Sequence, residues 1–245
     1  MRKFIFTILL LTLVYAINSD EFTAATANWQ PYAIEDANKL VTGIGVDILK
    51  EVCKRTGDKV VIKIYPAERL NQMFDLNQID INFADSPNWN EIKKDSPFVF
   101  TESYTSVVEN IYFLANKYID VKTPNDLKQK RVGIVRGYYY EMFKESFKNK
   151  IVLLEETNNE SFLIQMLKKD RLDCAFFDNY VFDYLLVKNN FKMSDFKKGL
   201  QLSDSPLCFK VRIEKKDIVT RFNKALLEMK KEGVITKIIL KYTNK

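Results

Sequence analysis

Apolar and polar positions follow two different periods along the chain, and segments of the two kinds alternate. Short segments rich in Val, Ile and Phe are either continuously apolar or alternate with polar residues, which is typical of strands. Between them, apolar residues recur every three to four positions, as in helices packed on a core. The predicted strands are 22–27, 59–65, 80–84, 98–100, 104–115, 131–135, 151–154, 172–177 and 207–211. The predicted helices are 45–55, 66–76, 138–147, 159–169, 182–188, 217–231 and 234–242.

Local signals mark several boundaries. Gly57 follows the first helix, Pro66 opens the second, and Thr123 is placed to cap a short helix that begins at Pro124. Strands that alternate with helices predict parallel sheets covered on both faces. The pattern restarts after residue 115, and 104–115 and 207–211 are suited to cross between two bodies. We therefore expect two α/β units with a cleft between them, lined by loops at the carboxyl ends of strands.

The first sixteen residues differ from the rest. Arg2 and Lys3 precede an apolar run from Phe4 to Val14, and Ala16 closes a small-residue cleavage pattern. The run is shorter than the roughly 20 residues that span a bilayer. We expect residues 1–16 to be a cleaved signal peptide and the mature chain to be periplasmic or secreted. A retained N-terminal anchor is the alternative.

Composition narrows the classes of function. Thirty-eight basic residues are interspersed with 32 acidic ones and form no basic block, so no nucleic-acid partner is expected. The chain has no histidine, and its three cysteines show no metal-binding spacing, so we expect neither a metal site nor a cofactor. Cys53 and Cys174 lie in apolar surroundings that favour buried free thiols. Cys208 could pair with either of them.

Seven segments, taken in order, resemble the extracytoplasmic (periplasmic) solute-binding proteins of the amino-acid ABC-transporter type. They are residues 28–32, 43–57, 68–84, 99–104, 123–137, 172–178 and 222–243. The resemblance implies a hinged, two-lobe α/β fold of the periplasmic-binding-protein type II, with a central ligand cleft. Lobe 1 would comprise 20–113 plus 209–245, and lobe 2 would comprise 114–208.

The resemblance also implies a function. Such a protein closes on a small polar ligand, here an amino acid or a related amine or zwitterion, and delivers it to the permease of an ABC transporter. We expect a monomer without enzymatic activity. Two alternatives remain open from the residues: a module that senses its ligand for a membrane receptor, and a dehydratase-like enzyme that uses a cleft carboxylate as acid or base.

Asp178 is the principal candidate for ligand binding. It ends the apolar segment LDCAFF and matches the family position that usually holds the α-amino group of the ligand. A carboxylate at the end of a strand can hold an ammonium group through charge-assisted hydrogen bonds. The alternative is that Asp178 only caps the following helix.

The position that would bind an α-carboxylate departs from the family pattern. Family members that bind amino acids usually carry an arginine where this chain has Ile92, next to Lys93. Arg136, immediately before Gly137 and a predicted helix start, could supply a guanidinium from the other lobe. It could equally be a solvated residue at the end of a strand.

Aromatic and charged residues complete the set of candidates. Trp29, Tyr32, Trp89 and Tyr138 lie on predicted cleft loops, where rings can hold a cation or stack on a flat ligand. Tyr139 and Tyr140 are expected to pack in the core. The remaining candidates occupy ends of strands on the cleft side: Glu68, Arg69, Asp85 and Ser86. Glu68 and Arg69 could simply pair with each other on the first turn of a helix, whereas Asp85, if it faces the cleft, would add negative charge that favours a cationic or polyol ligand.

Overall fold

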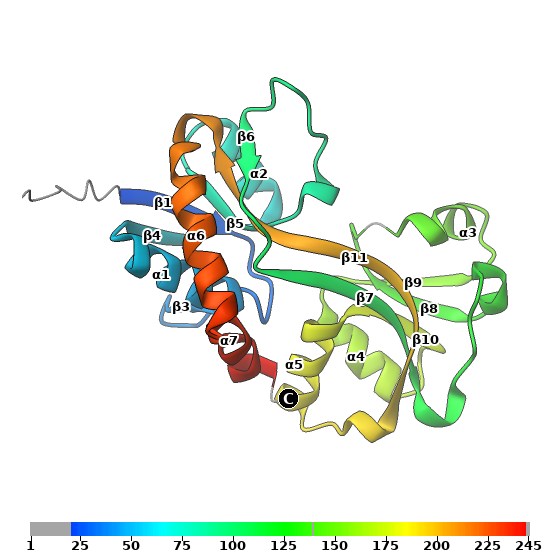
Figure 1. Cartoon of the computed structure of the whole chain (residues 1–245). Helices are drawn as coiled ribbons and strands as arrows, with labels where there is room; N and C mark the ends of the chain where they lie inside the picture. Colours follow the sequence, from blue (N-terminus) through cyan, green and yellow to red (C-terminus); the bar gives the residue numbers. More distant parts are fainter. Residues whose placement is uncertain (1–20, 139, 244–245) are drawn as a thin grey trace, which may run out of the picture.

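The computed structural model describes residues 21–138 and 140–243, and it consists of two bodies bridged by two long strands (Figure 1). The predicted signal peptide, residues 1–16, lies outside the described residues. None of the helices in the described part of the chain has the length and apolar character needed to cross a membrane.

The first body is built around three parallel strands. β1 (Glu21–Thr26) pairs with β4 (Lys59–Ile64) on one side and with β5 (Ile81–Asp85) on the other. Apolar residues on one face of β1 and β5 pack with two helices, α1 (Ile44–Thr56) and α6 (Asp217–Lys231). The opposite face packs against α2 (Ala67–Asp75). A ribbon of β2 (Ile34–Glu35) and β3 (Val41–Thr42) lies between β1 and α1 in the chain.

The second body repeats this plan. β8 (Arg131–Val135) pairs in parallel with β9 (Leu153–Thr157) and with β10 (Cys174–Asp178). Helices α4 (Glu160–Lys168) and α5 (Asn179–Asn189) pack on one face of these strands, and α3 (Lys144–Lys148) lies towards the other (Figure 1). Because neighbouring residues of a strand face opposite ways, Phe177 joins the core under α4 and α5 while Phe176 packs on Phe143.

Two antiparallel strands join the bodies into one sheet. β7 (Thr105–Leu114) pairs with β10 and with β11 (Phe196–Arg212). β11 pairs with β7 from Phe196 to Leu207, and then with β5 and with β6 (Phe98–Phe100) from Cys208 onwards. The strands run in the order β4-β1-β5-β11-β7-β10-β8-β9, with β6 on the side of β11. The predicted crossing strands are confirmed, but β11 begins well before the predicted residue 207.

One predicted helix begins later than expected. The pattern predicts a helix over 138–147, but the described chain bends after Val135, where Gly137 adopts a positive φ of 86°. Helical structure starts only with the 3-10 turn η4 (Glu141–Phe143) and continues into α3. Tyr140 instead packs edge-on against Phe176, at 5.0 Å between ring centroids, so aromatic packing overrides the helical period.

Most other predicted elements are confirmed within a few residues. The capping role of Thr123 is confirmed by a capping box with Asp126 at the start of η3 (Pro124–Leu127). The other 3-10 turns of the described chain are η1 (Pro87–Trp89), η2 (Ala115–Lys117), η5 (Met193–Asp195) and η6 (Ile213–Lys215). All three cysteines are buried and free, which confirms the expectation for Cys53 and Cys174. Burial raises the pKa of the Cys53 thiol to about 12 and that of Cys208 to about 11.

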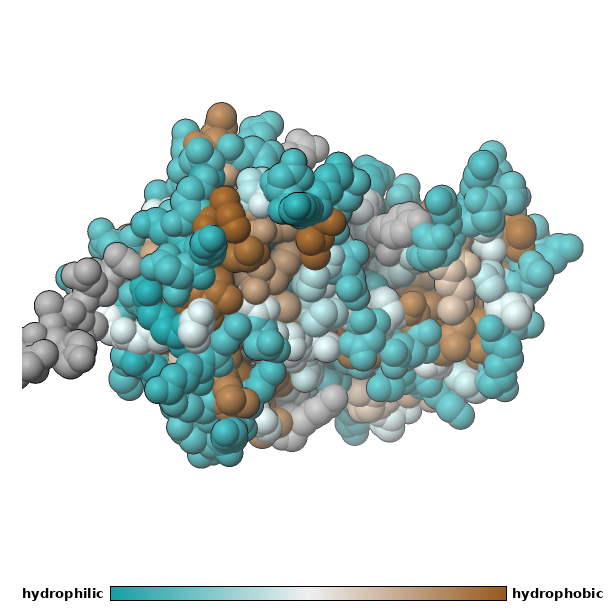
Figure 2. Space-filling view, turned by 45° about the horizontal axis from the view of Figure 1, so that its top comes forward, coloured by the Kyte–Doolittle hydropathy of each residue, from teal (hydrophilic) through white to brown (hydrophobic). Residues whose placement is uncertain are grey.

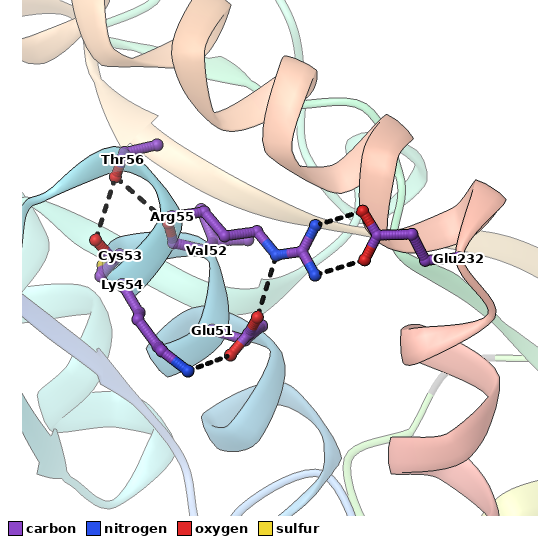
Figure 3. A network of polar contacts seen from close by, with 7 residues as sticks. All are labelled: Glu51, Val52, Cys53, Lys54, Arg55, Thr56 and Glu232. Carbon is purple, nitrogen blue, oxygen red and sulfur yellow. Dashed lines mark hydrogen bonds and ion pairs between the residues drawn. The ribbon is translucent and has the colours of Figure 1, made fainter.

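Hydrogen bonds and packing hold the C-terminal helices against the first body. Arg55 of α1 forms two hydrogen bonds with Glu232, which ends α6, at 2.9 and 2.6 Å, and a third with Glu51 at 2.9 Å (Figure 3). These partners raise the pKa of the Arg55 guanidinium and lower that of Glu232. The final helix, α7 (Val234–Thr243), contacts α1, α6 and α5. Helix α7 therefore packs against helices of both bodies.

The surface carries no large continuous apolar area on the face shown in Figure 2. Hydrophilic side chains cover most of this face, and hydrophobic residues form separate patches on both bodies. The large apolar side chains most exposed in the described chain are likewise spread over many elements, among them Leu76, Phe162 and Leu40. Single exposed apolar residues of this kind are normal on the surface of a folded protein.

Candidate ligand-binding site

Asp178 and Tyr32 meet where the two bodies face each other. Asp178 ends β10 and caps α5, because its side chain accepts a hydrogen bond from the backbone N–H of Tyr180 at 3.0 Å. The Tyr32 hydroxyl, from the other body, lies 2.9 Å from both carboxylate oxygens and donates to them. Both residues are buried, with exposed fractions of 0% for Tyr32 and 6% for Asp178. The predicted helix cap and a contact across the two bodies therefore coexist at one carboxylate.

Burial decides the protonation of this pair. Burial raises the pKa of Asp178 to about 8, although the hydrogen bond from Tyr32 works in the opposite direction. Burial and the nearby carboxylate also raise the pKa of Tyr32 well above its usual value. Tyr32 therefore keeps its proton and is the donor, while Asp178 changes charge close to neutral pH.

Tyr32 is placed by the start of α1. The first N–H groups of this helix hold the preceding loop, with Ile44 donating to the carbonyl of Pro31 and Gly45 to that of Tyr32, both at 2.9 Å. Gly43 allows this approach: its φ is 133°, and a Cβ there would lie 2.5 Å from the carbonyl oxygen of Tyr32. The sequence 43–45 thus fixes the ring that reaches Asp178.

Glu109 is a functional candidate that the sequence analysis missed. It lies on β7, directly opposite Asp178 on β10 and Ser203 on β11. The Ser203 hydroxyl donates to Glu109 at 2.7 Å, and Tyr140 also hydrogen-bonds to it. Burial raises the pKa of Glu109 despite both bonds. A single acidic residue within the apolar run 107–113 is the signal that could have identified it.

Tyr138 and Glu160 form the outer part of the same group. The Tyr138 hydroxyl donates to Glu160, the first residue of α4, at 2.6 Å. Tyr138 is 39% exposed, yet desolvation of its hydroxyl and the Glu160 carboxylate raise its pKa above the usual value, with smaller contributions from Glu109 and Asp178. We call Tyr32, Glu109, Tyr138, Glu160 and Asp178 the junction site. It combines three carboxylates with tyrosine hydroxyls.

Aromatic rings border the junction site on the side of the first body. Trp29 packs on Tyr32 at 4.3 Å between centroids and lies edge-on to Trp89 at 6.1 Å. The Trp29 Nε1 atom is buried and has no hydrogen-bond partner among the described residues. Trp89 is 49% exposed. Three of the aromatic residues that the sequence analysis selected are therefore adjacent, and one of them carries an unused donor.

Asp85 and Ser86 have structural partners instead of open surroundings. Asp85 ends β5 and pairs with Lys210 of β11 at 3.3 Å; Asn90 donates to its other oxygen at 2.8 Å. The Ser86 hydroxyl caps η1 by accepting from the N–H of Asn88. The expectation that Asp85 adds negative charge to the cleft is corrected, because Lys210 balances that charge.

Arg136 and Gly137 directly precede Tyr138 in the chain, but the ion pair of the Arg136 side chain is with Glu156, outside the junction site. The Arg136 side chain is 66% exposed and its Nε lies 4.0 Å from Glu156. It borders a groove of about 460 Å³ beside α4, together with Phe162 and Lys169. The predicted helix N-terminus at Gly137 is absent, because Arg136 and Gly137 form a turn. The expected support of Arg136 by a helix N-terminus is therefore wrong.

The remaining candidates lie on the first body. Arg69 is exposed on α2, with its guanidinium over the Tyr65 ring at 5.4 Å. Glu68 belongs to the same helix, but its side chain lies outside the described part of the structure. Ile92 is 58% exposed, and the neighbouring Lys93 pairs with Glu91 at 3.1 Å. No group of acidic, cysteine or histidine side chains in the described chain has the arrangement of a metal site.

Curated relatives cover most of the chain. It is 25% identical to the arginine-binding extracellular protein ArtP of Bacillus subtilis over 231 residues, which is 89% of this chain and 83% of ArtP. It is also 25% identical to the histidine-binding periplasmic protein of Salmonella typhimurium over 221 residues, 87% of this chain and 84% of that protein. Both relatives are binding proteins that work outside the cytoplasm, according to their names.

A solved structure and a family description complete the comparison. An ancestral arginine-binding protein bound to arginine superimposes with a TM-score of 0.68 at 25% identity, covering 91% of this chain and 97% of that one. This confirms the periplasmic-binding-protein fold. Residues 23–245 match the bacterial extracellular solute-binding proteins, family 3, which are binding proteins and not enzymes. The resemblance found in the sequence is thus confirmed, and the chain belongs to the bacterial extracellular solute-binding proteins of family 3.

Proposed function

We propose that this protein captures a small solute bearing an amino group outside the cytoplasm and delivers it to the permease of an ABC transporter. The observation that carries the proposal is the buried carboxylate of Asp178, placed at the end of a strand and contacted from the other body by Tyr32. The relatives that bind arginine and histidine, both of which carry an amino group, support the class of ligand.

The two bodies correspond to the lobes that close on the ligand. We assign residues 20–113 and 209–245 to lobe 1 and residues 114–208 to lobe 2. The change of partners along β11 supports this division, since β11 pairs with β7 up to Leu207 and with β5 and β6 from Cys208. Bending of β7 and β11 near this point would move the lobes relative to each other.

Binding uses charge and aromatic surface together. An ammonium group at the junction site donates charge-assisted hydrogen bonds to Asp178, whose two oxygens have room for more donors than Tyr32 and the Tyr180 N–H supply. The rings of Trp29 and Trp89 add cation–π attraction or stack on the ligand. The Trp29 Nε1 donor is available to an acceptor on the same ligand.

Partner and location follow from the same proposal. The ordered, ligand-bound arrangement of the two lobes is the form that a permease would recognise, and a single copy of the chain suffices to form it. The predicted signal peptide and the periplasmic or extracellular relatives support a site of action in the periplasm or outside the cell.

A ligand screen tests the proposal. The mature chain, residues 17–245, is heated with amino acids, amines, sugars or organic acids, and the shift in melting temperature is recorded. A ligand at 100 times its Kd stabilises the folded state by about 2.7 kcal/mol. We expect shifts with compounds that carry an amino group. Shifts only with sugars or organic acids would contradict the proposal, and turnover of a bound compound would indicate an enzyme instead.

A further inference from the structure

We infer that the junction site selects solutes with two cationic groups, and that Glu109 provides the second carboxylate beside Asp178. The site is that of the proposed function, on which this inference rests. Glu109 was not selected by any sequence motif. Its place on the strand that bridges the two bodies makes it part of the site.

The strand register places the two carboxylates together. Glu109 on β7 is directly opposite Asp178 on β10, so both side chains leave the same face of the sheet. Directly opposite residues in antiparallel strands have Cβ atoms about 5 Å apart. Two cationic groups joined by a short flexible chain can therefore reach one carboxylate each.

The groups around Glu109 and Asp178 supply hydroxyl and backbone donors but no positive charge. Ser203 of β11 and Tyr140 bond to Glu109, and Tyr32 and the Tyr180 N–H bond to Asp178. Within the described chain, no Lys or Arg forms a hydrogen bond or ion pair with either carboxylate, nor with Glu160 at the outer edge.

Two shielded carboxylates elsewhere in the described chain have a cationic partner. Asp58 pairs with Arg221 at 2.9 Å, and Asp85 pairs with Lys210 at 3.3 Å. Two carboxylates beside each other in a low-dielectric site repel one another, and each loses hydration on burial. A ligand with one positive charge balances only one of them, whereas a ligand with two balances both.

The pKa shifts in the unliganded site agree with the need for two positive charges. Burial raises the pKa of both Asp178 and Glu109, and the Glu109 charge adds to the shift at Asp178. Without a ligand, Asp178 lowers the charge of the site by holding a proton below about pH 8. A dication stabilises the ionised form of both carboxylates and displaces this proton.

Matched ligand pairs test the inference by isothermal titration calorimetry on the mature chain. The first pair is 1,4-diaminobutane and 1-butylamine; the second is lysine and norleucine. In each pair the two molecules differ mainly by one cationic group. We expect the dication to bind at least about 30-fold more tightly, as one additional charge-assisted hydrogen bond predicts. Equal affinities within a pair would overturn the inference while leaving an amine receptor in place.

Two variants assign the effect to Glu109. Glu109→Gln keeps the size of the side chain and its bond from Ser203, and we expect it to reduce the preference for the dication to about threefold, mainly by weakening binding of 1,4-diaminobutane. Glu156→Gln, on the edge strand β9 and outside the junction site, is the matched control and should keep the full preference. A preference that survives in Glu109→Gln would overturn the role of Glu109. Absence of binding by any amine would instead contradict the proposed function itself.

Discussion

Asp85 and Asp178 occupy equivalent places in the two bodies but have different partners. Each is the last residue of a buried strand, β5 or β10, and their exposed fractions are 9% and 6%. Asp85 has the ammonium of Lys210 at 3.3 Å, whereas the described partners of Asp178 are the Tyr32 hydroxyl and backbone N–H groups. A balanced carboxylate stabilises the fold, and an unbalanced one retains its capacity for a cationic ligand.

The contacts of Lys210 indicate that the Asp85 carboxylate has a structural role. Its ammonium donates to Asn90 at 2.7 Å and lies over the rings of Phe74 and Phe98, at 4.9 and 4.4 Å from their centroids. Asn90 in turn donates to Asp85. These contacts hold the segment after β5, which carries Trp89, against β11.

Asp85→Asn removes the charge of the carboxylate that pairs with Lys210, and it should have the largest effect on stability. The variant leaves the Lys210 ammonium in a shielded position without its countercharge, which costs about 3 kcal/mol in the free energy of unfolding. Urea denaturation measures this loss. The double variant Asp85→Asn, Lys210→Met removes both charges and should recover part of it. An unchanged stability in the single variant would mean that the pair contributes nothing to the fold.

Asp178→Asn removes the charge of the carboxylate whose described partners are all uncharged. It should affect binding more than folding. Asparagine also caps helices well, so α5 keeps its N-terminal hydrogen bond. Loss of the charge weakens the hydrogen bonds to an ammonium ligand, and we expect the Kd for an amine to rise about 100-fold, measured by calorimetry at pH 8. An unchanged Kd would remove Asp178 from the binding site.

The pH dependence of binding tests the role of Asp178, because the pKa of its carboxyl group in the free protein is about 8. A bound ammonium favours the ionised carboxylate, so amine affinity should rise between pH 6 and pH 8, by at most about tenfold per pH unit, with release of protons. The increase should end above pH 8 and be smaller in Asp178→Asn, where Glu109 is the remaining carboxylate with a raised pKa. An affinity independent of pH in the wild type would contradict this coupling.

The same shift determines how the unliganded fold responds to pH. The pKa of Asp178 is higher in the folded chain than the usual value of 3.8, so the folded state binds more protons between these two values. Its contribution to stability is therefore present at low pH and is lost as the pH rises towards 8. Calorimetric melting of the wild type and of Asp178→Asn should show that the difference between them grows over this interval.

The sequence predicted the elements whose apolar pattern is set by a core. α6 has the predicted bounds, Asp217–Lys231, because its apolar residues repeat along one face that packs on the first body. The early part of β11 was not predicted, since its residues include Lys197, Lys198 and Gly199, which are unusual in an isolated strand pattern. Pairing with β7 supplies the hydrogen bonds that keep this part extended.

The candidate site was predictable only in part, for a related reason. Trp29, Tyr32 and Asp178 lie in loops or at a strand end, where spacing along the chain already indicates a shared edge. Glu109 is placed by the register of three strands, and the charge of Asp85 is balanced by a lysine far along the chain. Neither fact follows from local pattern, because both depend on which strands pair.

Arg136→Ala should have the smallest effect. Arg136 is exposed beside Glu156 and borders the groove along α4, so its removal should change the Kd for an amine less than twofold and leave the fold intact. Calorimetry with an amino acid and with the corresponding amine checks this expectation. If only the amino acid lost affinity, by tenfold or more, Arg136 would reach the ligand carboxylate after lobe closure. The two charges of the ligand would then be balanced at the carboxyl ends of two neighbouring parallel strands, with Arg136 after β8 holding the anionic end and Asp178 of β10 the cationic end.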